Sequence, residues 1–334
     1  MPPTPASPTD KIHSNAPENH QFTIGWICMR PLEFHAAREA FDEPYGKHPH
    51  TTRAADKNFY ELGRIGKNKV VMACIPSNDP SITMARNVSA SMKATFPSIQ
   101  VGLMVTTGSG IPSSRHDIRL GDIVVGTPDR TFKGIVGFRE GQPGPDPVKQ
   151  INSPGFNTYS RLLVPAALAL RTDRTLKPQS KVPSILSRMF DWQPEKIEAH
   201  TYQGSSHDKL FEASYKHQNK SDGHCMHCNT DRLIKRAARK DTVDPVVHYG
   251  TIASGDQPVT DAGVREFLEM RFGSKGVQVG AAGLNGEFPT LVVVGVGDYA
   301  DSHRNEHWSR YAAAVAAAYA KELLLTIPDL LLEM

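Results

Sequence analysis

Apolar residues along this chain alternate between short continuous runs and stretches of helical periodicity. Continuous Val-, Ile- and Leu-rich runs are typical of strands that are covered on both faces, and apolar residues three and four positions apart predict helices. The runs predict strands over residues 22–29, 101–105, 123–125, 246–256 and 291–297, with a hairpin over 59–75. The helical spacing predicts helices over residues 31–38, 81–96, 182–192, 262–272 and 310–327.

Strands that alternate with helices predict a mainly parallel sheet and therefore an α/β fold. The length of 334 residues allows one large domain or two smaller ones. Residues 1–20 are rich in Pro, Ser, Thr and Asn without apolar periodicity, so we expect a disordered leader there. Residues from about 138 to 245 combine prolines and lysines with patchy helical signals, and we expect them to form an insertion over the core.

Charge and composition indicate which classes of binding partner this protein lacks. Lys and Arg total 38 against 35 for Asp and Glu, a formal net charge of +3 that indicates neither a nucleic-acid nor a membrane partner. The longest apolar runs are too short to span a bilayer and no secretory signal is present, so we expect a cytoplasmic protein. The chain carries no Rossmann fingerprint, and we expect no cofactor.

The four cysteines, Cys28, Cys74, Cys225 and Cys228, do not form a disulfide framework and fit a reducing compartment. Residues 224–228 read His-Cys-Met-His-Cys, but one chelating turn is only half of a structural zinc site. We therefore expect free thiols or a disulfide and no metal site, and the sequence leaves open whether Cys225 and Cys228 bind metal or pair. The basic run over residues 235–240 is expected to be solvated surface.

Candidate chemistry follows the strand over residues 291–297, which delivers Asp298. Carboxylates at the carboxyl end of such a strand lie where α/β folds keep their ligand sites, although Asp298 could also cap the structure after the strand. Glu33 falls in the first turn of a predicted helix, where the helix dipole favours any carboxylate. Arg86 could pair with Asp79 or with an acidic ligand, or simply lie on the surface.

Five segments, taken together and in order, resemble the fungal branch of the nucleoside phosphorylase and nucleosidase superfamily. They are residues 24–33 (IGWICMRPLE), 117–122 (DIRLGD), 248–255 (HYGTIASG), 281–284 (AAGL) and 297–303 (GDYADSH). The resemblance implies a single three-layer, phosphorylase-like domain over residues 21–334, with a central mixed and partly barrel-like sheet. It also implies a homo-oligomer in many members and a pocket for a purine or pyrimidine nucleoside.

The resemblance assigns roles within that pocket. It implies that Asp298 is the acid at the leaving base and that Glu33 activates water. The family's Glu-Met-Glu, whose second Glu holds the sugar hydroxyls, falls on residues 278–280, which read Gln-Val-Gly here. The glycine-rich phosphate loop has become Thr-Thr-Gly-Ser-Gly over residues 106–110, and the second loop reads Pro-Ser-Asn-Asp-Pro over 76–80. Both the sugar site and the phosphate site are therefore expected to be degenerate.

These departures favour an enzyme with a repurposed pocket. Asp298 and Glu33 would perform acid/base chemistry, such as cyclisation, isomerisation or elimination, on a small organic molecule, with fungal secondary metabolism as one setting. The expected substrate-binding residues are Asn78, Arg86, Thr107, Gly108, Ser109, Ser254, Gln278, Val279, Gly280 and Tyr299. The first alternative is a nucleosidase or phosphorylase that cleaves the N-glycosidic bond of a purine nucleoside. The second is a non-catalytic purine or nucleoside sensor.

Overall fold

The computed structural model describes residues 17–47, 56, 58–75, 80–141, 146–151, 160–176, 180–190, 200–217, 225, 227–239, 244–284, 286–304 and 306–327. The expected leader lies mostly outside these residues, and so do the predicted site residue Asn78 and its neighbour Asp79.

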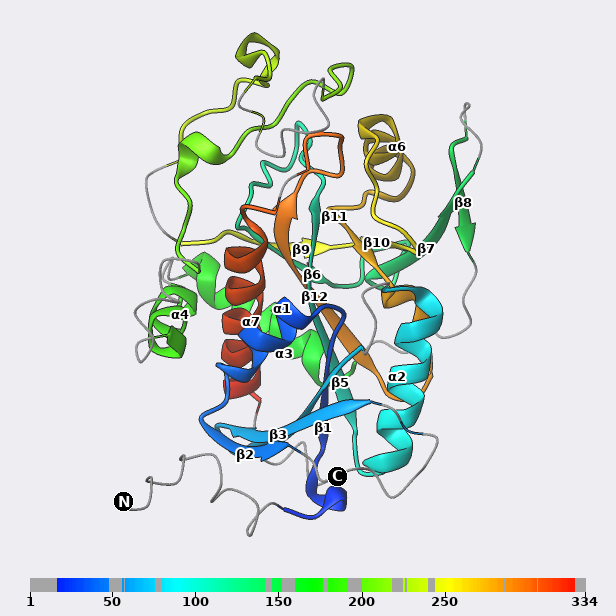
Figure 1. Cartoon of the computed structure of the whole chain (residues 1–334), viewed down its shortest axis with the longest axis vertical. Helices are drawn as coiled ribbons and strands as arrows, with labels where there is room; N and C mark the ends of the chain where they lie inside the picture. Colours follow the sequence, from blue (N-terminus) through cyan, green and yellow to red (C-terminus); the bar gives the residue numbers. More distant parts are fainter. Residues whose placement is uncertain are drawn as a thin grey trace, which may run out of the picture.

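The strands of the described residues form one mixed sheet (Figure 1). Its main path is β2-β3-β4-β1-β5-β11-β10-β7-β8, while β12 pairs with β5 and β6, and β6 pairs with β9. The strands are β1 (Ile24–Cys28), β2 (Glu43–Lys47), β3 (Phe59–Ile65), β4 (Asn68–Cys74), β5 (Val101–Gly110), β6 (Ile123–Gly126), β7 (Ile135–Glu140), β8 (Val148–Ile151), β9 (Val247–Gly250), β10 (Ile252–Gly255), β11 (Gly276–Val279) and β12 (Thr290–Asp298).

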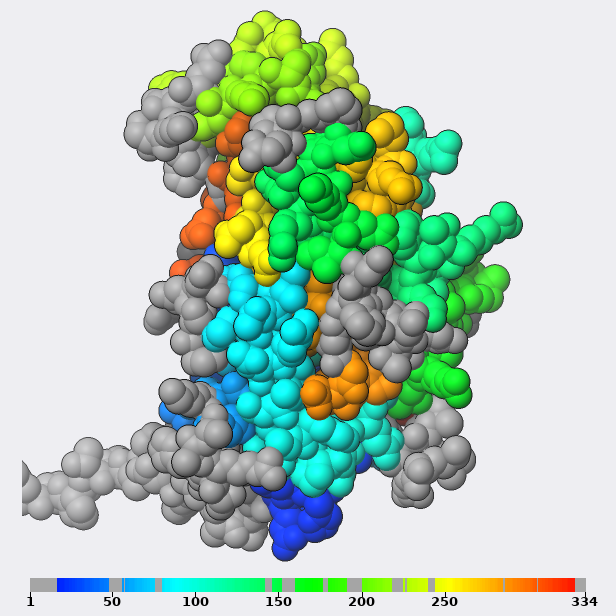
Figure 2. All heavy atoms as spheres, turned by 90° about the vertical axis from the view of Figure 1, so that its right-hand side faces the viewer, coloured from blue at the N-terminus to red at the C-terminus, as the bar shows by residue number. Residues whose placement is uncertain are grey.

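Helices cover the sheet on both sides and complete three layers (Figure 1). Helices α1, α3 and α4 pack with α7 on one side, whereas α2 and α6 lie on the other, and Figure 2 shows the side that α2 covers. The helices are α1 (Pro31–Arg38), α2 (Ile82–Thr95), α3 (Leu163–Leu176), α4 (Val182–Phe190), α6 (Ala262–Phe272) and α7 (Ser309–Leu325). None of the helices in the described residues has the length and apolarity that a membrane crossing requires.

The predicted fold class is confirmed, and the described strands leave the sheet open instead of closing it into a barrel. One local prediction was wrong. Residues 106–110 were expected to form a loop, but β5 continues through them to Gly110. The reason is that β5 gains neighbours on both sides there, since it pairs in parallel with β12 and in antiparallel with β11. A Cβ on Gly108 would lie 2.4 Å from the Val277 carbonyl oxygen, so glycine is what lets β5 and β11 approach.

Small residues also set the packing of α7 on the sheet. The helix is Ala-rich and almost wholly buried. A Cβ on Gly295 of β12 would lie 1.9 Å from the Ala312 carbonyl oxygen, so the helix and the strand are in direct backbone contact. The expected insertion contributes to the same core, because buried side chains of α3 and α4, such as Leu163 and Ile185, belong to the cluster that α7 and the sheet share.

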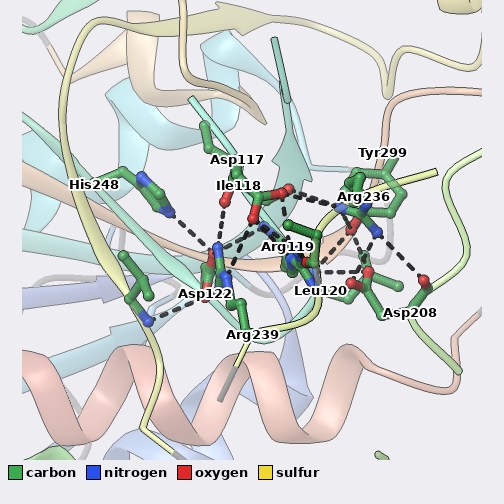
Figure 3. A network of polar contacts seen from close by, with 12 residues as sticks. Asp117, Ile118, Arg119, Leu120, Asp122, Asp208, Arg236, Arg239, His248 and Tyr299 are labelled. Atoms are coloured by element: carbon green, nitrogen blue, oxygen red, sulfur yellow. Dashed lines mark hydrogen bonds and ion pairs between the residues drawn. The ribbon is translucent and has the colours of Figure 1, made fainter. Parts of the chain in front are cut away.

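The segment at residues 117–122, one of the five that carry the resemblance, is a structural anchor, as Figure 3 shows. Asp122 is buried, and its two oxygens accept hydrogen bonds at 2.7 and 2.8 Å from Arg239. His248 Nε2 lies 3.0 Å from Asp122 Oδ2. Burial alone would raise the pKa of the Asp122 carboxyl, but the contacts with His248 and Arg239 outweigh it and lower that pKa below its ordinary value.

The basic run at residues 235–240 differs in part from the solvated surface that the sequence predicted. Lys235 is exposed, Arg236 and Arg239 are half-buried, and Lys240 lies outside the described residues. The side chain of Arg236 is only 14% exposed and contacts Asp208 Oδ2 at 2.8 Å, while Arg239 contacts Asp122 (Figure 3). Arg236 also donates to the Tyr299 hydroxyl at 3.0 Å. These arginines hold the described part of residues 200–239 against the sheet, which the linear sequence could not reveal because their carboxylates lie far away in the chain.

We predict that Asp122→Asn lowers the free energy of unfolding by about 1.5–3 kcal/mol at neutral pH, because Arg239 and His248 lose a charged hydrogen-bond acceptor in a buried position. A carboxyl with a lowered native pKa stabilises the fold above its unfolded pKa, and this contribution is lost as the pH falls through the native value. The difference from the wild type should therefore shrink as the pH falls below about 4. Denaturant unfolding measured between neutral and acidic pH checks this.

The matched control is Asp173→Asn, an exposed aspartate of α3 that lies outside this network. It should cost less than about 1 kcal/mol. Equal costs for the two substitutions would contradict the anchoring role of Asp122.

Candidate functional site

The predicted pocket residues converge on a cavity of about 230 Å³ at the carboxyl ends of β1, β5 and β12. Its described lining is Met29, Arg30, Pro80, Thr106, Thr107, Gly108, Ser109, Pro258, Val259, Val277, Gln278, Val279, Asp298 and Arg304. Of the predicted site residues, Thr107, Gly108, Ser109, Gln278, Val279 and Asp298 are therefore brought together. Among the described lining residues Asp298 is the one carboxylate, and none is His or Cys, so this set offers no good metal site.

Asp298 reaches the cavity because β12 is irregular at its end. The pairing register with β5 shifts between Val296 and Asp298, and bulges of this kind re-aim a side chain. The Asp298 Oδ1 atom accepts the Ala300 backbone N–H at 2.9 Å, which is the capping role that the sequence allowed. The Oδ2 atom lies 3.1 Å from Arg304 Nε, so a cation lies beside this carboxylate in the cavity wall.

Glu33 lies behind the cavity wall and is not part of the described lining. Within the described chain its carboxylate accepts five hydrogen bonds: Oε1 from the Thr106 hydroxyl and from the Thr107 backbone N–H and hydroxyl, and Oε2 from the Met29 and Arg30 backbone N–H groups, all at 2.7–3.0 Å. Burial raises the pKa of the Glu33 carboxyl, and the hydrogen bonds from Thr107 and Thr106 oppose that rise. This arrangement fastens the end of β1 to β5. Its predicted role as a water-activating base stays a prediction.

The position of the expected sugar carboxylate holds apolar atoms. Gly280 has φ +93°, and a Cβ there would lie 2.4 Å from Met29 Cε and 3.1 Å from the Ser81 carbonyl oxygen. The methyl group of Met29 therefore occupies the space beside Gly280. Gln278 is buried, and its Oε1 accepts the Ala281 backbone N–H at 2.8 Å. Ser254 supports this turn, since its hydroxyl oxygen accepts the Ala282 N–H at 2.9 Å.

Two predicted site residues lie elsewhere. Arg86 is exposed on α2 and is not among the residues that line the cavity. Tyr299 points the other way, into the network of Figure 3, where its hydroxyl donates to Asp208 and accepts from Arg236. Burial raises the pKa of Tyr299 well above its ordinary value. Sequence reasoning missed Met29 and Arg304, because neither follows a motif and both acquire meaning only from the fold.

Comparisons with known proteins identify the fold. No protein-family model matches the chain. Three solved nucleosidase structures superpose on 91% of it. The first is a 5'-methylthioadenosine/S-adenosylhomocysteine nucleosidase from Helicobacter pylori, with a TM-score of 0.56 over 98% of that chain. The second is futalosine hydrolase from Helicobacter pylori, with a TM-score of 0.54 over 97% of its chain. The third is a 5'-methylthioadenosine/S-adenosylhomocysteine nucleosidase from Neisseria meningitidis, with a TM-score of 0.52 over 99% of its chain, and each of the three is 14% identical to this chain. The fold is that of the nucleoside phosphorylase and nucleosidase superfamily.

One relative is closer in sequence. A nucleotide-binding leucine-rich repeat (NLR)-like protein of Hyaloscypha variabilis is 36% identical over 319 residues, which is 94% of this chain. The chain spans only 30% of the length of that relative. The comparison therefore relates this chain to one part of a much longer protein.

We predict that Gly280→Ala lowers the free energy of unfolding by about 2–4 kcal/mol. About 1–2 kcal/mol of this loss arises because alanine disfavours the left-handed backbone conformation at this position. The remainder arises because the added methyl group overpacks against Met29. Gly286 is the matched control, because it has φ +85° and nothing within 4 Å of a built Cβ. Gly286→Ala should show the backbone cost alone. In a double-mutant cycle, Met29→Ala should relieve part of the Gly280→Ala cost; strict additivity would contradict the packing described.

We also predict that Glu33→Gln destabilises the protein. In Glu33→Gln, one of the two carboxylate oxygens is replaced by an N–H₂ group, which cannot accept the hydrogen bonds that this oxygen accepts. Each donor that loses its acceptor in this way costs about 1–3 kcal/mol. Urea unfolding of Glu33→Gln against the exposed control Glu287→Gln measures this. Stability equal to that of the control would mean that the Glu33 carboxylate is free for chemistry.

Proposed function

We propose that the cavity binds a purine base or its nucleoside through Asp298, and that the protein does not cleave the N-glycosidic bond at an enzymatic rate. The observation that carries this proposal is the combination of a carboxylate at the base end of the cavity with an apolar sugar end. Asp298 lines the cavity, whereas Gly280 and the Met29 methyl group occupy the place of the sugar carboxylate. On this account the protein is a ligand sensor that retains the fold of the nucleosidases.

The cavity suits a flat heterocycle. Pro258, Val259, Val277 and Val279 supply apolar walls, and Asp298 supplies a hydrogen-bond acceptor for an N–H group of the ring. The described walls enclose about 230 Å³, below the roughly 300 Å³ at which pockets for drug-sized ligands begin. A base or a compact nucleoside matches that size better than an extended substrate does.

Cleavage of an N-glycosidic bond makes demands that the described lining of this cavity meets only in part, since Asp298 is the one carboxylate among those residues. The transition state is oxocarbenium-like, and its positive charge calls for a nearby carboxylate and for an activated nucleophile. A charge-assisted hydrogen bond is roughly twice as strong as a neutral one, so the loss of the sugar carboxylate removes substantial stabilisation. Glu33, the predicted base, already accepts its hydrogen bonds from β1 and β5.

Sensing is further supported by the NLR-like relative, because a ligand-binding domain within such a protein would pass on occupancy and would need no turnover. The second candidate is a nucleosidase, which the fold comparisons and the retained Asp298 favour. The repurposed acid/base enzyme ranks behind these two, because the internal hydrogen bonds of Glu33 leave Asp298 without its expected catalytic companion.

We predict saturable binding of a purine base or nucleoside to the purified chain by isothermal titration calorimetry. Asp298→Asn should weaken this binding at least about tenfold, since hydrogen bonds to charged groups contribute about 1.5–3 kcal/mol. The matched control is Asp173→Asn, on the exposed face of α3, which should leave the affinity unchanged. Chromatography of the same nucleosides, with and without phosphate, should show no base release above the buffer blank.

The outcomes separate the candidates. Sustained base release that Asp298→Asn abolishes would establish the nucleosidase and overturn the sensor. Failure of every purine and purine nucleoside to bind would overturn both and leave the repurposed enzyme.

A further inference from the structure

A second cluster of reactive side chains lies outside the cavity described above. His217 Nδ1 is 3.1 Å from Cys228 Sγ and 3.6 Å from Cys225 Sγ, and the three ligand atoms all lie within 4.8 Å of one another. In a tetrahedral zinc site, bond lengths of about 2.3 Å to sulfur and 2.0–2.1 Å to nitrogen place neighbouring ligand atoms about 3.5–3.8 Å apart. The cluster is therefore close to the spacing of a metal site before any side chain moves.

The segment around the cluster has a small hydrophobic core and little regular structure, so a cross-link would stabilise it. Phe211, Cys225 and Cys228 form a small hydrophobic cluster of their own, separate from the main core, with Tyr215 and Leu233 packed against it. Within the described part of residues 200–239, regular structure is limited to two short 3₁₀ helices and one isolated bridge. A segment with so little core is commonly held by a metal or by disulfides.

The arrangement also argues against two ordinary thiols. Cys225 and Cys228 are both buried and are not joined to each other. One imidazole nitrogen faces both sulfurs, yet its single lone pair or proton serves only one of them. A divalent cation would satisfy all three atoms at once, and it would release the two thiol protons as the thiolates bind.

We propose that His217, Cys225 and Cys228 bind a structural Zn²⁺ ion. The sequence alone favoured free thiols or a disulfide, because the Cys-x-x-Cys turn supplies only two ligands; the fold adds His217 as the third. The His303 imidazole is a candidate for the fourth position. It is buried, neither of its nitrogens has a hydrogen-bond partner among the described residues, and Nδ1 lies 3.8 Å from Asp301 Oδ1. Its ring centroid lies 5.5 Å from that of His217.

The ion would tie the described part of residues 200–239 to the segment that follows Asp298 at the end of β12. The His217 backbone N–H donates to the Ser302 hydroxyl at 2.9 Å, and Cys225 Sγ lies 3.8 Å from the His303 carbonyl oxygen. The His303 ring stacks on Phe211 with centroids 4.1 Å apart. Cys225, Asp298 and His303 line a further cavity of about 310 Å³, so the zinc site would border a cavity that shares Asp298 with the base-binding cavity.

The test is the metal content of the untagged full chain, measured by mass spectrometry after exhaustive dialysis. We expect about one zinc per chain, as for a single structural site. The zinc content should fall at least tenfold in Cys225→Ser and in Cys228→Ser. The matched control Cys74→Ser, at a buried cysteine in β4, should keep its zinc.

Two measurements on the wild type keep the test decisive even if the serine variants fold poorly. Replacement of zinc by Co²⁺ should give thiolate charge-transfer bands and the visible bands of tetrahedral cobalt, and modification of the thiols should release the metal.

His303→Phe should retain zinc less tightly if His303 is the fourth ligand, and unchanged zinc binding would remove His303 from the site. A zinc-free chain with a Cys225–Cys228 disulfide, or full zinc retention in the serine variants, would overturn the proposal.

Discussion

The structure depends on one buried carboxylate that joins two neighbouring strands. Glu33 joins the residues just after β1 to the continuation of β5. It accepts from the backbone N–H groups of Met29 and Arg30 on one side, and from the Thr106 hydroxyl and the Thr107 N–H and hydroxyl on the other. Because β5 also pairs with β11 and β12, this single side chain fixes the relative position of the elements that line the cavity. A group held so firmly is suited to defining the shape of a site, and less suited to exchanging protons in it.

This constraint explains how a nucleosidase fold can support a different function. The walls of the cavity depend on strand pairing and on Glu33, which do not require the sugar or phosphate ligands. On the proposed function, a sugar carboxylate was lost at Gly280, beside which the Met29 methyl group now lies, without loss of the fold. Asp298 remained at the end of β12, where a bulge and Arg304 hold it. On the proposed function, recognition of a base persists in this cavity although cleavage has ceased.

Much of the fold could be predicted from the sequence, because strands such as β1 and β12 and helices such as α2 and α7 carry strong local patterns. The continuation of β5 through residues 106–110 could not, since glycine and hydroxyl residues form a strand there only because β11 and β12 pair with them. The site was predictable where it follows strand ends, as at Asp298. Met29, Arg304 and the contacts of Arg239 arise from segments distant in sequence, which no local pattern reports.

The most direct test of this account is a crystal structure of the protein soaked with a purine nucleoside that the calorimetry shows to bind. The account predicts an intact nucleoside, with its base hydrogen-bonded to Asp298 and its sugar against the Met29 methyl group. A cleaved base with a separate sugar in the cavity would contradict the account, and so would a nucleoside bound elsewhere on the protein.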